Sequence, residues 1–446
     1  MFELSVAVDK NNGIGYNGDL PWYCKEELQL FKNLTLNNAV VFGSRTIETL
    51  PKLENREIYC LTKGNKLYKA KNFYTIINNL DELLTLDKKV IIAGGAKVYE
   101  TALSCPKYVD IVHISVMKKE YRCDTYFNHC LLDDFVIIEE KEYDEFIYYK
   151  MQRTNNGENQ YLRLLSKIIE EGKLKNGRNG NTISLFTEHF KFDLRKGFPL
   201  LTTKKMFLRG IIEEFLFFLR GETDSTILSD KNVRIWEGNT TEEFIKNKGL
   251  NYAKGVMGPM YGYQWRNFGA PYTRNEEGKP IDSLIKGIDQ LENVINLIKT
   301  DPNSRRILMT SYNPSQAEEG VLYPCHSIAM QFYVDDDYLD MFCFNRSQDT
   351  FLGVPYNIAS SSLLLMLVAK LTEKIPRFFN MTMGDTHLYQ EHITVAKKQL
   401  KRTPYKFPRL ILPNINNIDE INNLKYEDFT LENYKSYESL KAKMIA

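Results

Sequence analysis

A cysteine with a proline before it and a histidine after it lies at the start of an expected strand, in the stretch YPCHS. A nucleophilic cysteine needs a depressed pKa, and therefore a cation or a helix dipole nearby. Adjacent side chains of a strand point to opposite faces, so His326 is a poor base for Cys325. Arg346 and Ser347, at the end of the expected return strand, are better partners. A guanidinium there favours the thiolate and also binds an anion.

Two alternatives for Cys325 are open at this point. A buried cysteine often serves as a small apolar side chain, and this is the ordinary interpretation of one cysteine taken alone. A zinc site is disfavoured, because no second cysteine or histidine stands at metal-ligand spacing from Cys325.

Other polar residues of the second half are unusual for simple core packing. Arg305 and Arg306 are adjacent in DPNSRRILM, and Arg178 lies on a Gly/Asn-rich turn. His387 and Tyr389, in GDTHLYQEH, share a face if the chain there is extended. Taken alone, each of these polar residues could have an ordinary structural role, as a surface charge or in a capped turn. Together with a cysteine, these arginines indicate a phosphate-carrying substrate that is attacked by sulfur.

The first third of the chain holds a carboxylate beside apolar side chains. In GIGYNGDLPWYCKEELQLF, a Gly/Asn loop runs into an expected helix. Glu27 and Phe31 share a face of that helix, with Leu28 beside them. A half-buried carboxylate there could hold a charged heterocycle through paired hydrogen bonds. The alternative is that Glu26 and Glu27 are both solvated acids of the first turn.

A glycine pair follows an expected buried strand in VIIAGGAKVYETAL. Glycines let the backbone approach a ligand, and the N-terminus of the next helix attracts phosphate. Alone, Gly94 and Gly95 could equally form an ordinary tight turn.

These residues need elements to position them, and the two halves of the chain differ in pattern. The first alternates strands and helices, which predicts an α/β domain with a mostly parallel sheet. The expected strands are 2–8, 39–43, 57–61, 89–95, 108–116, 135–143 and 146–153, and the expected helices are 26–35, 80–86 and 96–103.

The second half reads as an α+β domain. It has expected helices at 160–172 and 206–221, a hairpin of strands 327–334 and 338–345, and an almost wholly apolar helix at 359–371. The polar, turn-rich stretch 154–159 is the expected linker. The predicted domains are therefore residues 1–153 and 160–446.

Composition limits the classes of protein. The chain has 446 residues, which favours more than one domain, and a formal net charge of +1, which gives no sign of a nucleic-acid or membrane-surface partner. Its longest apolar run is too short to span a bilayer. Seven scattered cysteines and a strand-like N-terminus lead us to expect a reducing compartment, the cytoplasm.

Residues 2–152 resemble the dihydrofolate reductases, through GIGYNGDLPW, the helical acid with Phe31, FGSRTIETL, Arg56, IAGGAKVYE and DTYF. The resemblance implies reduction of dihydrofolate with NADPH. Glu27 would hold the pterin ring and help to deliver a proton to N5, and Arg56 would pair with the glutamate tail. Folate would also contact Leu28 and Phe31. The residues implied at NADPH are Ala7, Ile14, Gly43, Ser44, Arg45, Thr46, Thr62, Lys63, Gly94, Gly95, Ala96, Lys97 and Tyr99.

Two departures from that family carry expectations. At the cofactor turn the family usually has an arginine directly after the glycine. This chain has Ser44 there and Arg45 next, so the positive charge is displaced by one position. Val112 stands where a threonine usually backs the acid, and we expect the loss of a hydroxyl partner of Glu27.

Residues 160–446 resemble the thymidylate synthases along nearly their whole length. The shared motifs include GFPLLTTKK, IIEEFLFFLRGETD, GPMYGYQWRNFGA, DPNSRRI, YPCHS, NRSQDTFLGVPYNIAS and GDTHLYQEH. The resemblance implies that Cys325 attacks C6 of dUMP, with methylenetetrahydrofolate as cosubstrate and no metal. Glu214 and Tyr261 would mediate proton transfers. The residues implied at dUMP are Arg178, Arg305, Arg306, Arg346, Ser347, Asp349, Asn357, His387 and Tyr389.

Further implications follow from the same resemblance. Trp236, Asp349 and the C-terminal Ala446 would meet the folate, and the C-terminal KMIA would close over the site. Arg305 and Arg306 would serve the partner subunit's site, which requires a homodimer. The turn that carries Arg178 is one residue shorter than is usual, which puts the aim of that arginine in question.

The chain as a whole is therefore expected to be a bifunctional enzyme of dTMP synthesis. Two other classes of protein are less consistent with these residues. A cysteine hydrolase using Cys325 and His387 would leave GDLPW and the arginines unexplained. A non-catalytic binding protein is opposed by the presence of the acids, the cysteine and the arginines, and the near-neutral charge gives no basic footprint for nucleic acid.

Overall fold

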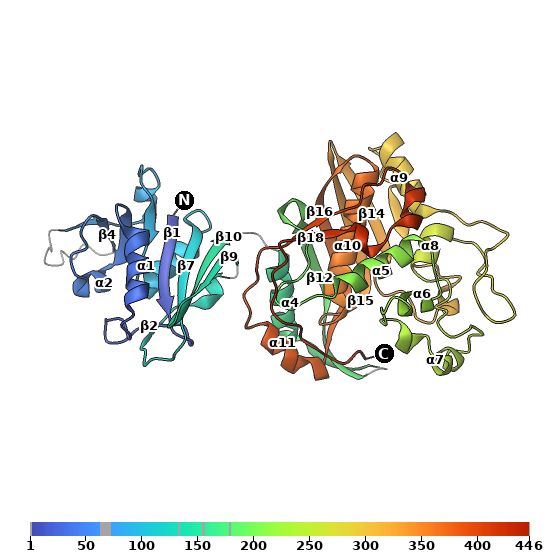
Figure 1. Cartoon of the computed structure of the whole chain (residues 1–446), viewed down its shortest axis with the longest axis horizontal. Helices are drawn as coiled ribbons and strands as arrows, with labels where there is room; N and C mark the ends of the chain where they lie inside the picture. The colour runs from blue at the N-terminus through green and yellow to red at the C-terminus, as the bar shows by residue number, and fades with distance from the viewer. Residues whose placement is uncertain (1, 63–72, 133, 154–156, 178–179, 446) are drawn as a thin grey trace. The chain divides into compact units, whose positions relative to one another are not determined.

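The computed structural model describes residues 2–62, 73–132, 134–153, 157–177 and 180–445. The chain divides into two compact units, which Figure 1 shows with their elements labelled. The reductase-like unit comprises Met1–Asn156 with Thr403–Lys406, and the synthase-like unit comprises Gly157–Arg402 with Phe407–Ala446.

The reductase-like unit alternates strands and helices, as predicted. Its elements are β1 (Phe2–Val8), β2 (Gly13–Gly15), α1 (Lys25–Thr35), β3 (Ala39–Gly43), α2 (Ser44–Thr49), β4 (Glu57–Leu61), β5 (Tyr74–Ile77), η1 (Leu80–Leu83), β6 (Val90–Ile92), α3 (Ala96–Leu103), β7 (Val109–Met117), β8 (Thr125–Tyr126), η2 (His129–Leu132), β9 (Phe135–Glu142) and β10 (Phe146–Arg153).

Eight of these strands form one sheet in the order β5-β4-β3-β6-β1-β7-β10-β9. The strands from β5 to β7 pair in parallel, and β10 pairs antiparallel with both β7 and β9. The prediction of a mostly parallel sheet is confirmed. Because β3 and β6 are parallel neighbours, the turns that follow them lie at the same edge, where open α/β sheets bind ligands.

One expected helix of this unit is wrong in type and length. Residues 80–86 were expected to be helical, but only Leu80–Leu83 form a single 3₁₀ turn. Asn79 and Glu82 cap that turn reciprocally, and the chain then leaves it at Leu84. One short capped turn has too few hydrogen bonds to propagate an α-helix.

The synthase-like unit combines helices with a mixed sheet. Its elements are α4 (Gly157–Glu171), β11 (Lys173–Gly177), β12 (Gly180–Asp193), η3 (Leu194–Lys196), α5 (Leu208–Leu219), α6 (Thr226–Ser229), η4 (Glu237–Asn239), α7 (Glu242–Asn247), α8 (Gly262–Asn267), α9 (Gln290–Thr300), β13 (Leu308–Thr310), η5 (Ala317–Glu319), β14 (Ala329–Asp335), β15 (Tyr338–Asp349), α10 (Gly353–Leu371), β16 (Ile375–Tyr389), η6 (Gln390–His392), α11 (Ile393–Gln399), β17 (Arg409–Ile411), η7 (Ile418–Asn423), η8 (Tyr426–Asp428) and β18 (Thr430–Glu432).

Six strands of this unit form a sheet in the order β11-β12-β16-β15-β14-β13. All pairs are antiparallel except β15 with β16. The predicted hairpin is β14 with β15, and the predicted apolar helix is α10. Their side chains meet in one core, where α10 packs against β15 and β16 and α5 packs against α10.

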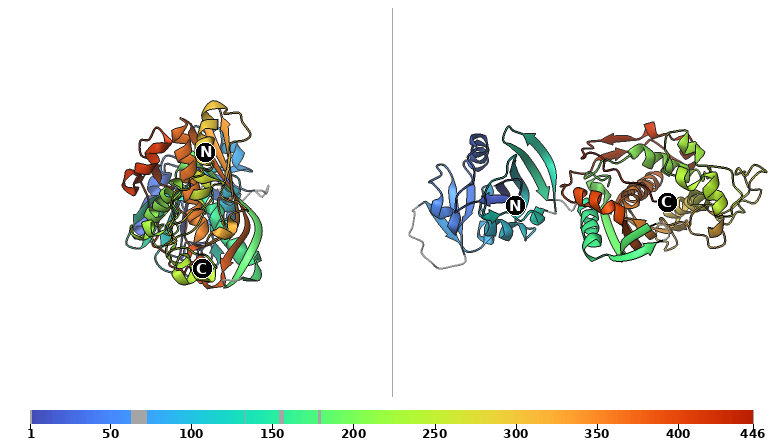
Figure 2. Two further views of the ribbon diagram at one scale, coloured as in Figure 1. Left: turned by 90° about the vertical axis from the view of Figure 1, so that its right-hand side faces the viewer. Right: turned by 90° about the horizontal axis from the view of Figure 1, so that it is seen from below.

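The helix α10 is long and apolar enough, by length and composition, to cross a membrane. Most of its residues are nevertheless buried within the unit, among them Leu363, Leu367 and Val368. The right-hand view of Figure 2 shows α10 surrounded by other elements of the unit. Burial on nearly all sides is typical of a core helix, which is apolar around its whole circumference for that reason.

Candidate active sites

The segment before β14 brings Cys325 to Arg346. The strand begins later than expected, at Ala329, because Ser327 has a φ of 51° that interrupts the extended backbone. The Cys325 carbonyl nevertheless accepts hydrogen bonds from the backbone N–H groups of Arg346, at 3.0 Å, and Ser347, at 3.3 Å. The end of β15 therefore holds the cysteine segment through its backbone.

The thiol of Cys325 faces a tyrosine. The hydroxyl of Tyr261 lies 3.5 Å from Cys325 Sγ and accepts the Cys325 backbone N–H at 3.2 Å. Burial raises the pKa of the Cys325 thiol, while the Tyr261 hydroxyl and the Arg346 charge act to lower it. The expectation of a depressed pKa is wrong for the protein alone, because burial outweighs its two favourable neighbours.

The guanidinium of Arg346 is fixed on the cysteine segment. Its Nε donates to the Pro324 carbonyl at 2.8 Å, and its Nη2 donates to the Tyr323 carbonyl at 3.2 Å. Because the carbonyls are neutral, these bonds leave the positive charge without a counter-ion, and Nη1 makes no recorded bond among the described residues. The guanidinium is thus held in a fixed orientation beside the cysteine segment and is still able to bind an anion.

His326 occupies a different place from the one expected. Its ring stacks on Tyr261, with centroids 4.3 Å apart and planes at 15°. The argument from alternating strand faces fails here, because the segment is not an extended strand. Burial lowers the pKa of His326 to about 4, so the imidazole is neutral at pH 7. It packs beside the tyrosine that contacts the thiol.

The helix α5 carries the predicted proton-transfer acid. Glu213, on the same helix, is paired with Lys231 at 2.6 Å, whereas Glu214 accepts the indole N–H of Trp236 at 2.8 Å. Burial raises the pKa of Glu214 to about 7, against the lowering effect of that indole. A carboxyl with a pKa near the working pH can both hold and release a proton.

The start of α10 and the end of β16 gather four predicted residues. Asp349 accepts the backbone N–H groups of Phe351 and Leu352, at 2.9 and 3.1 Å, which fixes the entry to α10. Asp349 and His387 are register partners of β15 and β16. The rings of His387 and Tyr389 pack edge to face at 5.4 Å. Asn357, one turn into α10, donates to Gln348 at 2.7 Å.

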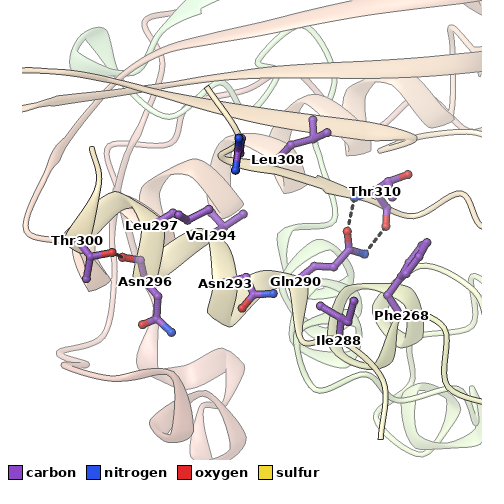
Figure 3. A pocket seen from close by; sticks show the side chains of 11 residues that line it. Phe268, Ile288, Gln290, Asn293, Val294, Asn296, Leu297, Thr300, Leu308 and Thr310 are labelled. Carbon is purple, nitrogen blue, oxygen red and sulfur yellow. Dashed lines mark hydrogen bonds between the residues drawn. The ribbon is translucent and has the colours of Figure 1, made fainter. Parts of the chain in front are cut away.

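Arg305 and Arg306 lie apart from this cluster. Both are exposed and precede β13, the edge strand of the sheet. Their guanidinium groups have no recorded hydrogen bond or ion pair within the described part of the chain. A hollow of about 540 Å³ along α9 is lined by Arg306 but by no other predicted site residue. Figure 3 shows Gln290, one of the residues that line it, bonded to the backbone of Thr310.

Three predicted residues cannot be placed. Arg178, Lys63 and Ala446 lie outside the described residues.

In the reductase-like unit, Glu27 is buried and Glu26 is exposed, which rules out two solvated acids. Burial raises the pKa of Glu27 to about 7, and a hydrogen bond from Ser115 opposes this. The expectation that Val112 costs the acid its hydroxyl partner is wrong. Ser115, three residues further along β7, supplies that hydroxyl.

The other predicted folate contacts lie on or beside α1. Phe31 is half-buried and Leu28 is exposed on this helix. Arg56 donates from Nε to the buried Thr35 hydroxyl at 3.1 Å and from Nη1 to the Glu54 carbonyl at 2.8 Å. These neutral partners hold the guanidinium at the C-terminal end of α1 without neutralising its charge.

The turns after β3 and β6 form a narrow backbone cradle. Gly43 N–H donates to the Gly94 carbonyl at 2.8 Å, and Gly94 has a φ of 143°, which only glycine adopts easily. A Cβ on Gly95 would lie 3.2 Å from the Thr46 hydroxyl, and one on Gly43 would lie 3.0 Å from Val98. Because these glycines have no side chains, a ligand phosphate can closely approach the backbone of the turns. The helix α3 begins directly after the second turn.

The remaining predicted NADPH residues border this cradle or the neighbouring strands. Tyr99, on α3, donates its hydroxyl to the Ser5 carbonyl at 2.9 Å, and burial raises its pKa. Ser44, Arg45 and Thr46 open α2, Ala96 and Lys97 open α3, Ala7 lies on β1, Ile14 on β2, and Thr62 follows β4. The residues present therefore fit a phosphate-bearing dinucleotide.

Among the described residues, no group of three or more histidine, cysteine or acidic side chains could hold a metal ion.

Comparison with known proteins connects both sites to families. Residues 1–155 match the family model for dihydrofolate reductase, and residues 159–446 match that for thymidylate synthase. Bifunctional dihydrofolate reductase-thymidylate synthases align over both parts. That of Paramecium tetraurelia is 36% identical, covering 99% of this chain and 98% of its own. Those of Leishmania major (36%; 92% and 89%) and Zea mays (33%; 99% and 96%) are similar.

The chain belongs to the bifunctional dihydrofolate reductase-thymidylate synthase family. It is an enzyme with two activities. One makes dTMP and dihydrofolate from dUMP and methylenetetrahydrofolate, and the other reduces dihydrofolate with NADPH.

Membership of this family draws attention to polar residues that sequence reasoning missed. Lys204, in the TTKK motif, is buried and donates to the Phe351 carbonyl. Burial lowers its pKa to about 7, although Asp349 and Glu158 raise it. Gln348 holds Asn357 and has a buried amide nitrogen with no partner among the described residues. Both lay in motifs already noted, but only the fold shows which neighbours they meet.

The Ser115 bond predicts a pH effect in the reductase unit. Replacing Ser115 by alanine removes a stabiliser of the ionised Glu27, so the pKa of Glu27 should rise further. The descending limb of kcat/KM for dihydrofolate reduction should move to higher pH by roughly half to one unit, since one hydrogen bond contributes about 1 kcal/mol. A pH–rate profile of Ser115→Ala checks this, and a shift to lower pH would contradict it.

Proposed function

We propose that Cys325 is the nucleophile of dTMP synthesis and that Tyr261, Arg346 and Glu214 assist it. The observation that carries this proposal is the convergence of three segments on one thiol. Tyr261 bonds the cysteine directly, Arg346 is fixed on the same segment, and Glu214 lies close enough to Tyr261 to affect its pKa. A buried cysteine of the core would not need these polar neighbours.

In this proposal the thiolate of Cys325 adds to C6 of uracil, and the electron pair of the C5–C6 double bond moves towards C5 and O4. C5 then attacks the methylene carbon of the folate substrate. Glu214 and Tyr261 move the proton that leaves C5. Loss of that proton breaks the bond between the methylene carbon and the folate nitrogen. The released folate then transfers a hydride to the methylene group, which completes the methyl group, and it leaves as dihydrofolate. Elimination of Cys325 restores the C5–C6 double bond and frees the thiol.

The nucleotide is held by groups of matching chemistry. Arg346 and Ser347 would bind the phosphate, together with Arg178. Asn357 would read the uracil edge, and His387 with Tyr389 would hold the ribose. Trp236 and Asp349 would face the folate, with Ala446 closing the site. Their support is that Arg346, Ser347, Asp349, Asn357, His387 and Tyr389 lie around the ends of β15 and β16 and the start of α10, whereas Trp236 donates to Glu214.

For the second activity we propose that Glu27 binds the pterin ring and carries the proton bound for N5. NADPH, when bound, supplies the hydride. A carboxyl with a pKa of about 7 is protonated in a large share of molecules at neutral pH. Arg56 would pair with the glutamate tail, and Gly43, Gly94 and Gly95 would admit the phosphates.

We also propose a homodimer formed through the synthase unit. The sheet face opposite α10 exposes large side chains on three adjacent strands, namely Leu308, Tyr333 and Phe342, which are 52, 63 and 39% exposed. Leu308 and Phe342 both pair in register with Gln331, so they share that face. A second copy of the chain would bury this apolar face. It would also give Arg305 and Arg306 an anion to bind.

A mixing experiment tests that arrangement. The Cys325→Ala chain keeps its arginines, and the Arg305→Ala/Arg306→Ala chain keeps its cysteine. Each alone should make little dTMP. Refolding the two together in equal amounts should restore about a quarter of the wild-type sites, because half of the dimers are hybrids and one site in each is complete. No recovery, in mixtures shown to contain hybrid dimers, would mean that the arginines act within their own chain.

A further inference from the structure

A buried histidine lies between the predicted nucleotide site and the C-terminal segment. His392 ends η6, directly after β16, and is 1% exposed. Its ring centroid lies 5.6 Å from that of Tyr389 and 5.7 Å from that of Phe351. Tyr389 is a predicted ribose contact, and Phe351 donates its backbone N–H to Asp349, a predicted folate and nucleotide contact. The imidazole therefore packs directly behind the nucleotide site.

One nitrogen of this ring is bonded to the C-terminal segment. His392 Nε2 lies 2.8 Å from the carbonyl oxygen of Lys443. A carbonyl can only accept, so Nε2 carries the hydrogen and donates it. Nδ1 is buried and has no partner among the described residues. Among the described residues, the one hydrogen bond of the His392 side chain is therefore made to the C-terminal segment. Its second ring nitrogen is left without a partner there, which is unfavourable for a buried polar atom.

The C-terminal segment has a second, separate anchor further upstream. Tyr437 N–H donates to the Thr202 carbonyl at 2.9 Å, and Arg402 bonds both the Thr203 carbonyl and Glu438. Beyond Glu438, the bond to His392 is the one hydrogen bond recorded for the described tail residues. Among the described residues, His392 therefore provides the one polar anchor of the chain beyond Glu438.

The end of the described chain reaches the nucleotide site. A Cβ added to Gly180 would lie 3.9 Å from Ile445 Cγ2 and 3.9 Å from a ring carbon of Tyr389. Ile445 and Tyr389 thus border the same glycine at the start of β12. The bond at Lys443 is two residues away from this contact.

We propose that His392 is a positioning residue that fastens the C-terminal segment 441–445 across the synthase site. The inference rests on the proposed function of that site. His392 touches no reacting atom and acts through the Lys443 carbonyl. Once the segment is fastened, Ile445 is held beside Tyr389, and water has less access to the reacting nucleotide and folate.

A double-mutant cycle tests this role. His392→Phe keeps a ring between Tyr389 and Phe351 but removes the donor. In the full-length chain, kcat/KM for methylenetetrahydrofolate should fall about tenfold, as expected for one lost buried hydrogen bond. In a chain that ends at Leu440, the same substitution should change this quantity less than twofold, because its target is absent. Equal losses in both chains would overturn the proposal.

Two further measurements separate positioning from simple damage. His392→Gln retains a side-chain N–H and should recover part of the loss, whereas a loss as large as that of His392→Phe would count against a donor role. Carboxypeptidase should release Ile445 faster from His392→Phe than from wild type, and equal rates would contradict the fastening. Dihydrofolate reduction by the same samples reports on intact folding. If the wild-type chain made no dTMP, the proposed function itself would be wrong.

Discussion

The Cys325→Ala chain should make dTMP at least about a thousandfold more slowly than wild type, because no other group can form the bond to C6 of uracil. In this variant the Tyr261 hydroxyl loses its sulfur partner, which lies 3.5 Å away in wild type. Glu214 and Arg346 remain in place, so the variant lacks the nucleophile alone. Uracil C5 is a poor nucleophile without that addition. Formation of dTMP, followed by chromatography over several hours, measures the residual rate.

Two controls make the Cys325 result interpretable. Cys130→Ala removes an exposed cysteine of the reductase unit and should leave dTMP formation unchanged. Cys325→Ser keeps the shape of the side chain but offers a hydroxyl with a much higher pKa, so it should be nearly as inactive as the alanine variant. A serine or alanine variant with a rate near that of wild type would exclude covalent catalysis by Cys325.

The second large effect concerns Glu27. Glu27→Gln should lower kcat/KM for dihydrofolate reduction at pH 7 by about a hundredfold or more, because an amide cannot deliver a proton. The sign of the pH dependence follows from the raised pKa. With a pKa of about 7, the wild-type carboxyl is protonated at lower pH and loses its proton as pH rises. The wild-type rate should therefore fall above pH 7, about tenfold per unit, and the glutamine variant should lose this dependence.

Glu26 provides the matched control for this change. It precedes Glu27 on α1, has the same chemistry and is exposed. Glu26→Gln should leave both the rate and its pH profile as in wild type. Equal effects of the two substitutions would mean that general charge, and not the buried carboxyl, governs reduction.

Much of this account could be predicted from the sequence because local patterns were strong. The parallel sheet follows from alternating apolar runs and helices, and residues 359–371 of α10 were evident as an almost wholly apolar segment. The families were predictable because many specific motifs occur in one order. Short elements were harder, since β5 and α2 have too few residues to show a period.

The details of the sites depended on contacts that local patterns do not contain. Spacing could not show that Ser115, rather than residue 112, faces Glu27, because this depends on how β7 packs against α1. The stacking of His326 on Tyr261 could not be predicted, because the positive φ of Ser327 interrupts the extended strand that the sequence pattern indicated. The raised pKa of Cys325 depends on burial, which the sequence of YPCHS does not reveal.

The most direct test is one coupled reaction containing dUMP, methylenetetrahydrofolate and NADPH, with dTMP and NADPH followed together. Wild type should oxidise one NADPH for each dTMP, because each turnover of the synthase gives one dihydrofolate. Cys325→Ala should make no dTMP and oxidise NADPH only when dihydrofolate is added. Glu27→Gln should make dTMP and accumulate dihydrofolate. If Cys325→Ala still made dTMP, or Glu27→Gln still oxidised one NADPH for each dTMP at the wild-type rate, the assignment of the two activities to these two residues would be contradicted.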